Sequence, residues 1–278
     1  MYPGYTYPML TTSAAARSVL QLFDTKSGQA PRLSDDFQSL FFAVHLDSGH
    51  PDGRRSSLRR VSAHRETALA FLARYEWQKN QAKKKELSEI QWMSFASLDV
   101  EHFFAILRSN FDGLANLVRE FASKRGQTPA SFNDLLADCQ EKSKLPRLVA
   151  LLGEETVSLL AACDWFVDLR DKRDKLTHNG ATSLALPFED TVSFVISHGG
   201  SSLRQNDLLK FNENLDDFEL FMAASFGSLL VLENALCRAI QARDVPFFEG
   251  QSWSQNPGYG ALCRLLERLA SRLSERGV

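Results

Sequence analysis

The chain has 278 residues, of which 44% are hydrophobic and 24% charged, as is typical of a soluble globular protein of one large or two modest domains. The first ten residues carry no positive charge, and the apolar segment Leu148–Val167 is interrupted by three acids, so neither a secretory signal nor a membrane span is expected. Four scattered cysteines and six dispersed histidines predict reduced thiols in a cytoplasmic protein, with no metal site and no cofactor.

The charge distribution is uneven, although the net charge is only −2. The segment Arg54–Lys85 contains ten basic and two acidic residues, which gives it a charge of +8 and leaves −10 on the remainder. Such a stripe can hold a phosphate backbone, or it can be a solvated helix face or a face that docks on the acidic remainder of the protein. The basic residues are Arg54, Arg55, Arg59, Arg60, Arg65, Arg74, Lys79, Lys83, Lys84 and Lys85.

Helical periodicity begins near the amino terminus. Ser13–Phe23 and Ser34–His45 predict two short amphipathic helices, and a long basic helix is expected after the loop Asp47–Ser57. We take residues 1–90 as an amino-terminal helical region that carries the basic segment 54–85. Residues 91–278 then form the main helical bundle, with one continuous domain as the alternative.

The clearest helix is predicted over Asp99–Ser123, where apolar residues recur with heptad spacing. This seam predicts packing against another helix, from the same chain by default or from a second copy of the protein. Glu101, Arg108 and Asp112 form a polar stripe beside the seam, where a rim of ion pairs is expected. The seam consists of Val100, Phe104, Leu107, Phe111, Leu114, Val118 and Phe121.

The rest of the chain predicts more helices and one hairpin. A short helix is expected over Ser131–Glu141, followed by an apolar helix that starts at Pro146, turns charged from Asp164 and has an optional break at Gly153. Apolar residues alternate near residues 182–197, which predicts a small β-hairpin. Helices return at Asn214–Arg243 and Gly258–Arg276. The expected fold class is therefore an all-α helical bundle with a small β-hairpin insertion.

The segment Arg170–His178 combines arginines, carboxylates and an imidazole, and Asn179-Gly180 follows as a helix stop. An arginine can hold a phosphate through two parallel hydrogen bonds, and a histidine can transfer a proton near neutral pH. On an ideal helix Arg173 and His178 lie about 140° apart. We therefore expect them to converge only if the helix distorts or ends between them, or if a second protomer brings its own pair close.

A salt-bridged, capped helix end is the competing interpretation of the same residues. Acid–base pairs at helical i,i+4 spacing, and a histidine favoured by the helix dipole, would need no catalysis. Asp174 has two expected partners, the imidazole of His178 or the guanidinium of Arg170. The expected pairs are Asp168 with Lys172, Asp171 with Lys175, and Arg170 with Asp174.

The segment Arg173–His178 resembles the signature of the HEPN superfamily, in which an arginine followed by a polar residue precedes a histidine near the end of a helix. The long core helix before it also fits, and the stretch Glu101–Asp112 resembles bacterial HEPN-like proteins of unassigned function. The resemblance covers roughly residues 90–245. It implies a helical bundle of HEPN type with the hairpin inserted after the motif helix.

The resemblance also implies a metal-independent endoribonuclease that acts as a homodimer and leaves 2′,3′-cyclic phosphate and 5′-hydroxyl ends. A toxin or defence effector with an antitoxin or regulatory partner would fit this activity. Arg173 would stabilise charge on the phosphate, His178 would act as general base or acid, and Asp174 would orient either of them. The residues implied to bind RNA are Arg170, Arg108 and Asn179.

The alternative is a non-catalytic HEPN-like protein that serves as a binding or dimerisation module. A metal-dependent hydrolase fits poorly, because the histidines are dispersed and no pair has ligand spacing.

Overall fold

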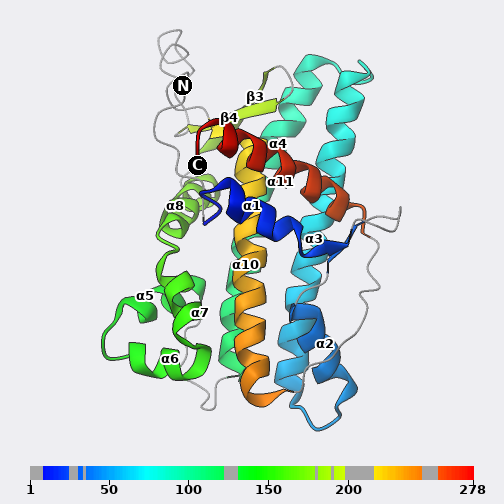
Figure 1. Cartoon of the computed structure of the whole chain (residues 1–278). Coiled ribbons are helices and arrows are strands. Elements are labelled where there is room, and N and C mark those ends of the chain that lie inside the picture. The colour runs from blue at the N-terminus through cyan, green and yellow to red at the C-terminus, as the bar shows by residue number, and fades with distance from the viewer. Residues whose placement is uncertain are drawn as a thin grey trace.

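The computed structural model describes residues 9–24, 31–33, 36–121, 131–178, 181–188, 191–197, 216–245 and 256–278. It confirms an all-α helical bundle with a small β-hairpin (Figure 1). The helices are α1 (Ser13–Leu20), α2 (Asp36–Leu46), α3 (Asp52–Lys83), α4 (Glu89–Phe121), α5 (Phe132–Gln140), α6 (Leu145–Leu152), α7 (Glu154–Ala161), α8 (Trp165–His178), α10 (Phe218–Asp244) and α11 (Gly258–Glu275). The strands are β1 (Phe23–Asp24), β2 (Arg32–Leu33), β3 (Thr182–Phe188), β4 (Thr191–Ser197) and β5 (Asp216–Asp217).

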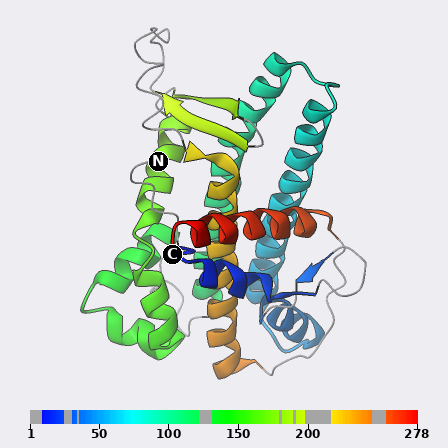
Figure 2. The ribbon, with the colours of Figure 1, turned by 45° about the horizontal axis from the view of Figure 1, so that its top comes forward.

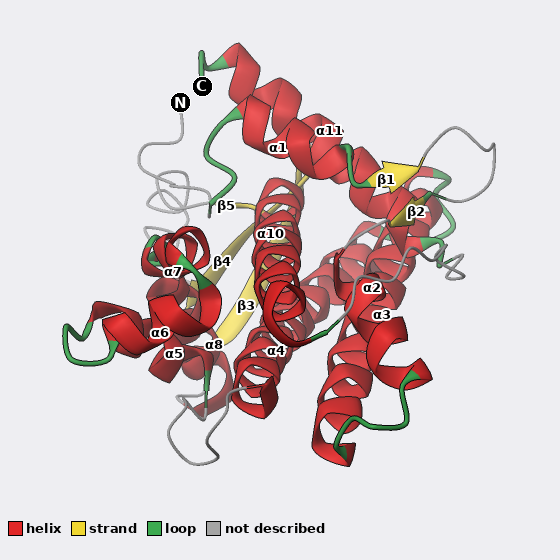
Figure 3. Ribbon diagram, turned by 60° about the horizontal axis from the view of Figure 1, so that its bottom comes forward, coloured by secondary structure: helices red, strands yellow, loops and turns green. Residues whose placement is uncertain are grey.

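Helix α10 is the central element of the bundle. It packs against α2, α4, α7 and α11, and Figure 3, which looks nearly along its axis, shows the other helices arranged around it. Within the described residues, its segment Phe218–Arg243 is the one helix long and apolar enough to cross a membrane, with a mean hydropathy of 1.6. Since 89% of that apolar window is buried inside the protein, a place in the core accounts for its composition.

Helix α1 and the carboxy-terminal end of the chain meet on one face of the bundle. Helices α1 and α11 pack together and cross α10, as Figure 2 shows. The backbone N–H of Ser13 donates to the carbonyl oxygen of Val278 at 3.1 Å. A single cluster of buried side chains runs from Leu10 to Leu273, so amino-terminal and carboxy-terminal segments share one core.

The predicted seam on α4 is confirmed, because each of its seven residues is at most 2% exposed. Helix α4 itself starts at Glu89, ten residues before the expected start. The seam is covered by several elements of the same chain rather than by one partner helix. The ring of Phe104 lies 5.4 Å from that of Phe221 on α10, and the ring of Phe111 lies 5.3 Å from that of Phe166 on α8. The seam is therefore not available to a second copy.

The basic segment forms α3, which pairs antiparallel with α4. Part of the positive charge of α3 pairs with buried acids of the same protein, as expected if this face docks on the acidic remainder of the chain. Three basic residues pair with acids of other helices that are at most 3% exposed. These pairs are Arg65 with Glu233, Arg74 with Asp99, and Lys79 with Glu219.

The optional break at Gly153 in the helix predicted from Pro146 is confirmed, but a second break was not predicted, so this stretch forms α6, α7 and α8. Gly153 separates α6 from α7 with a φ of 79°, in the left-handed region that glycine adopts without a steric penalty. A second break precedes α8, where the side chain of Asp164 accepts from the backbone N–H of Trp165 at 2.8 Å. The apolar character on most sides of this stretch reflects short helices that pack in different directions.

The hairpin β3–β4 follows α8 and rests on α4, and β5 adds a third strand. Its strands pair antiparallel with Leu184 opposite Val195, and β3 extends through Pro187. The hydroxyl of Ser183 donates to the carbonyl oxygen of Ser97 at 2.6 Å, and its backbone N–H donates to Oε1 of Glu101 at 3.2 Å. Glu101 thus anchors the hairpin instead of joining an ion-paired rim.

Candidate functional site

Helix α8 places the candidate residues beside α4. Phe166 and Leu169 are buried at 0% and 2% exposure, and the ring of Phe166 packs on Phe111 and Phe132. These contacts fix one face of α8 against α4 and α5. The charged side chains that follow lie at the border of this interface or on the open face.

Arg173 and His178 contact each other within one chain. Nη1 of Arg173 lies 3.2 Å from Nε2 of His178, which is exposed at the last residue of α8. A guanidinium can only donate, so Nε2 accepts this hydrogen bond and carries no proton in this arrangement. Arg173 is itself partly exposed, with 30% of its side-chain surface accessible. The pair is therefore open to solvent and to a ligand.

The expectation that these two residues converge only through a helix distortion, a helix end between them or a second protomer is wrong. Helix α8 runs unbroken through both residues. The angle of about 140° describes where the Cβ atoms leave the helix, and it ignores the reach of the side chains. The long arginine side chain spans the difference to a histidine in the last turn.

Asp174 pairs with Arg173 rather than with either expected partner. Its Oδ1 accepts from Nη1 of Arg173 at 2.8 Å, so this nitrogen faces both the carboxylate and the imidazole. Among the expected i,i+4 pairs, Lys172 does pair with Asp168 at 2.9 Å. Asp174 thus orients the arginine, one of the two roles that the HEPN resemblance implies.

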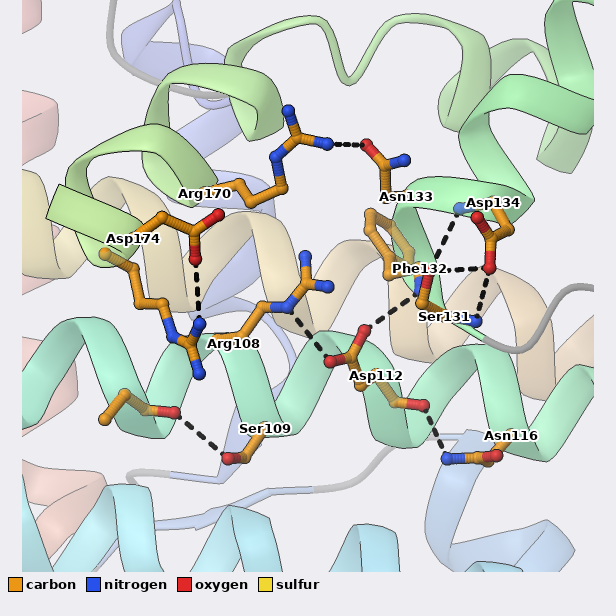
Figure 4. A network of polar contacts seen from close by, with 12 residues as sticks. Arg108, Ser109, Asp112, Asn116, Ser131, Phe132, Asn133, Asp134, Arg170 and Asp174 are labelled. Atoms are coloured by element: carbon orange, nitrogen blue, oxygen red, sulfur yellow. Dashed lines mark hydrogen bonds and ion pairs between the residues drawn. The ribbon is translucent and has the colours of Figure 1, made fainter. Parts of the chain in front are cut away.

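Arg170 and Arg108 lie near Asp174 between α8 and α4, as Figure 4 shows. Nη1 of Arg170 donates to Oδ1 of Asn133 at 2.8 Å and so ties α8 to α5. Nε of Arg108 lies 3.0 Å from Oδ2 of Asp112, which confirms an ion pair on the polar stripe of α4. The guanidinium of Arg108 also lies over the ring of Phe166, 5.2 Å from its centroid.

Two of these arginine nitrogens are buried without a partner. Nη1 of Arg108 and Nε of Arg170 make no hydrogen bond within the described part of the chain. Buried donors without an acceptor are rare in folded proteins, where water or a ligand usually satisfies them. These two nitrogens are closed to solvent, but the side chains that carry them are 18% and 34% exposed, and guanidinium groups suit a phosphate.

The remaining candidate, Asn179, lies outside the described residues, together with Gly180 and the predicted helix stop. Helix α8 ends at His178, the residue that was expected in its last turn. The backbone N–H of Ala181 donates to the carbonyl oxygen of Lys175 at 3.2 Å and brings the chain back toward α8.

The described residues contain no group of three or more histidine, cysteine or acidic side chains that could hold a metal ion. All four cysteines are buried. Burial raises the pKa of Cys139 and of Cys263 to about 11 and that of Cys163 to about 12. These thiols stay protonated at neutral pH and are poor nucleophiles.

A second polar cluster, which the sequence does not reveal, includes His102 on α4. In the structure His102 is exposed, and its Nδ1 lies 3.3 Å from Nη2 of Arg74, which also pairs with buried Asp99. Burial raises the pKa of Asp99 to about 6, although Arg74 lowers it in part. Sequence spacing gives no signal for this cluster, because Arg74 and Asp99 are far apart on different helices.

No protein-family model matches the chain, and no curated protein sequence or solved structure matches it. The class of protein that the coordinates define is an all-α helical bundle with a small β-hairpin inserted after α8. The HEPN resemblance rests on Arg173, Asp174 and His178 and on the helix that precedes them.

Proposed function

We propose that this protein is a metal-independent endoribonuclease of HEPN type that cuts RNA to 2′,3′-cyclic phosphate and 5′-hydroxyl ends. One observation carries the proposal. An arginine and a histidine meet at 3.2 Å on the exposed end of a helix, and Asp174 holds the arginine in place. This combination supplies an anion-binding group and a proton acceptor at the same point.

The arrangement suits cleavage by the neighbouring 2′-hydroxyl of the RNA. When a phosphate takes the hydrogen bonds of Arg173, Nε2 of His178 is released and can accept the 2′-hydroxyl proton. The 2′-oxygen then bonds to phosphorus, and the bond to the 5′-oxygen breaks. The guanidinium stabilises the negative charge that builds on the phosphate, and the leaving oxygen takes up a proton from water or a protonated imidazole.

The neighbouring arginines would hold the rest of the substrate. The side chains of Arg108 and Arg170 are 18% and 34% exposed, and their guanidinium groups suit adjacent phosphate oxygens. From the family resemblance we also propose that the protein is a cytoplasmic homodimer. Its role would be that of a toxin or defence effector with an antitoxin or regulatory partner.

A non-catalytic HEPN-like binding or dimerisation protein is the second candidate. The observation that favours it is the ion pairing along α8, where Arg173 pairs with Asp174 and Lys172 with Asp168. These pairs lower the net positive charge available to a nucleic acid. They also account for the motif as a stabilised helix end.

The two candidates are separated by incubating the purified protein with a single-stranded RNA pool in EDTA. The nuclease proposal expects cleavage with 2′,3′-cyclic phosphate ends, which is lost in Arg173→Ala and His178→Ala variants that keep their circular dichroism spectra. Arg272→Ala, which removes an exposed arginine of α11, is the matched control and should cleave normally. A folded, dimeric protein that cuts no RNA in the pool would favour the binding protein.

A further inference from the structure

Arg74, Asp99 and His102 form a second arginine–carboxylate–histidine cluster, here named the Arg74 cluster, on α3 and α4. Nη2 of Arg74 donates to Nδ1 of His102 at 3.3 Å and pairs with the carboxylate of Asp99. The Asp99 side chain is only 3% exposed, whereas that of Arg74 is 43% exposed. A buried acid therefore holds a guanidinium and an imidazole at the surface of the protein.

The Arg74 cluster has donors that can bind an anion from solvent. Within the described residues Arg74 hydrogen-bonds through Nη2, which leaves Nε and Nη1 for an external acceptor. Its guanidinium also rests against the ring of Phe71, 5.4 Å from the centroid, which limits its motion. Because Nε and Nη1 lie on opposite sides of the guanidinium, they cannot form one fork, but each can donate a single charge-assisted hydrogen bond to an anion.

An aromatic surface adjoins this guanidinium. Trp77 follows Arg74 by one helical turn on α3, so the two side chains are neighbours, and Trp77 is 59% exposed. Because α3 and α4 are antiparallel and Arg74 meets Asp99, Trp77 lies level with the turn of α4 that precedes Asp99. In that turn Phe95 and Leu98 are 38% and 62% exposed. Exposed aromatic rings beside a phosphate-binding arginine are the usual platform for unpaired bases.

The Arg74 cluster and the proposed active site border the same exposed face of α4. His102 and Arg108 are six residues apart, which on an ideal helix is about 9 Å along the axis and about 120° around it. Ala105 and Ser109 occupy the arc between them, and both are exposed. Figure 4 shows Ser109 on the side of α4 away from α8. The short side chain of Ala105 lies between the two sites, and Glu101, which anchors the hairpin through Ser183, borders the arc beside Arg108.

We propose that the Arg74 cluster and Trp77 form a second binding site for single-stranded RNA, with a phosphate on Arg74 and a base stacked on Trp77. This site extends the substrate path across α4, from the Arg173–His178 pair to α3. The inference rests on the proposed ribonuclease function for what happens to the strand, but the binding itself does not depend on cleavage.

The test measures binding of a single-stranded 2′-O-methyl RNA oligomer, which cannot be cut because its 2′-oxygen carries no proton. Trp77→Leu keeps an apolar side chain and removes the stacking ring. Arg74→Gln combined with Asp99→Asn removes the guanidinium without leaving a buried carboxylate unpaired. Arg272→Gln on α11 is the matched control for loss of one exposed positive charge. Thermal unfolding checks that each variant is folded.

We expect about fivefold weaker binding for Trp77→Leu and for the Arg74/Asp99 double variant, and unchanged binding for Arg272→Gln. The double variant should also lower the salt slope of log affinity by about 0.7, the value for one phosphate contact on a single strand. Wild-type-like affinity in both folded variants would overturn the inference. Binding of the same variants to phosphatidylserine vesicles is measured as well. Normal RNA binding with weaker vesicle binding would also overturn the inference, because the Trp77 surface would then be a lipid site.

Failure of this inference is distinguishable from failure of the proposed function. If the wild type cuts RNA but the Trp77 and Arg74 variants bind the oligomer normally, the nuclease stands and the second site falls. If nothing is cut but these variants lose binding, the second site stands in a non-catalytic RNA-binding protein.

Discussion

Nη1 of Arg173 donates to Nε2 of His178 across 3.2 Å within one chain, although the two residues leave α8 on different sides. The phosphate-binding group and the proton acceptor of the proposed reaction therefore come from the same protomer. The HEPN resemblance alone does not say whether one chain supplies both residues or whether two chains share them. The contact within one chain favours the first arrangement.

The first prediction concerns this origin of the pair. Mixing Arg173→Ala protein with His178→Ala protein, after exchange of subunits, should restore no RNA cleavage, because no chain then carries both residues. The measurement is the cleavage rate of the mixture against that of each variant alone. Recovery to a substantial fraction of the wild-type rate would mean that the two residues work in trans.

The second prediction concerns the buried ion pair between α3 and α10. Nη2 of Arg65 lies 2.8 Å from Oε1 of Glu233, and the two side chains are 7% and 2% exposed. Glu233→Ala should lower the unfolding free energy by about 3–5 kcal/mol, because it removes the carboxylate that pairs with a buried guanidinium. Urea unfolding gives this value.

The matched control for the ion pair is the double variant Arg65→Met with Glu233→Leu. It removes both charges and should restore most of the lost stability. If the double variant is as unstable as Glu233→Ala, packing rather than the unpaired charge dominates the loss.

The third prediction follows from Asp99, whose pKa is raised by burial from 3.8 to about 6. Because the folded protein holds this proton more tightly than the unfolded chain, the cost of burying Asp99 grows as pH rises from about 4 to about 6 and is constant above. Asp99→Asn removes that cost. Its unfolding free energy should exceed that of the wild type by an amount that grows across this window to about 2–3 kcal/mol.

Urea unfolding of the wild type and Asp99→Asn at several pH values measures this difference. A difference that is constant between pH 4 and pH 7 would show that Asp99 does not titrate in this range. Asp99 pairs with Arg74, which stays charged throughout and also contacts His102.

The fourth prediction concerns the end of α3. Lys85 has a φ of 60°, its N–H bonds to the carbonyl oxygen of Ala82, and the N–H of Glu86 bonds to that of Gln81. This is a Schellman motif whose left-handed position usually holds glycine. Lys85→Gly should raise the unfolding free energy by about 0.5–1 kcal/mol, because it removes the steric penalty of the left-handed conformation.

Lys84→Gly is the control for this helix end, since Lys84 has a right-handed φ of −79°. There glycine only adds flexibility to the unfolded chain and should destabilise by about 0.5–1 kcal/mol. Shifts of the same sign in the two variants would contradict the role given to the backbone of Lys85. Thermal unfolding of both variants decides between these outcomes.

Periodicity was enough to predict the helices, the hairpin and the seam on α4, because these depend on residues close in sequence. The start of α4 at Glu89 was missed because its first turns expose Ile90 and so lack the seam pattern. The break between α6 and α7 was predictable, because Gly153 marks it in the sequence. The break before α8 was missed, because the hydrogen bond from the backbone N–H of Trp165 to the side chain of Asp164 is not revealed by spacing.

The candidate site was predictable as a set of residues but not as a set of contacts. A helical wheel places Asp174 beside Arg170, yet Asp174 pairs with Arg173, and Arg170 reaches Asn133 on α5. Long side chains can pair with residues of the neighbouring helix as well as with residues of their own helix. The Arg74 cluster could not be predicted from the sequence, because its members lie on two helices, α3 and α4, that the turn between them brings together.

If Arg173 and His178 cut RNA, the single-turnover cleavage rate in EDTA must depend on both residues. Under saturating enzyme, Arg173→Ala and His178→Ala should each slow cleavage by about a hundredfold or more, the usual contribution of a general base or an oxyanion-stabilising group. The Arg272→Ala control should keep the wild-type rate. Equal rates in all four folded proteins, or no cleavage by the wild type, would contradict the claim.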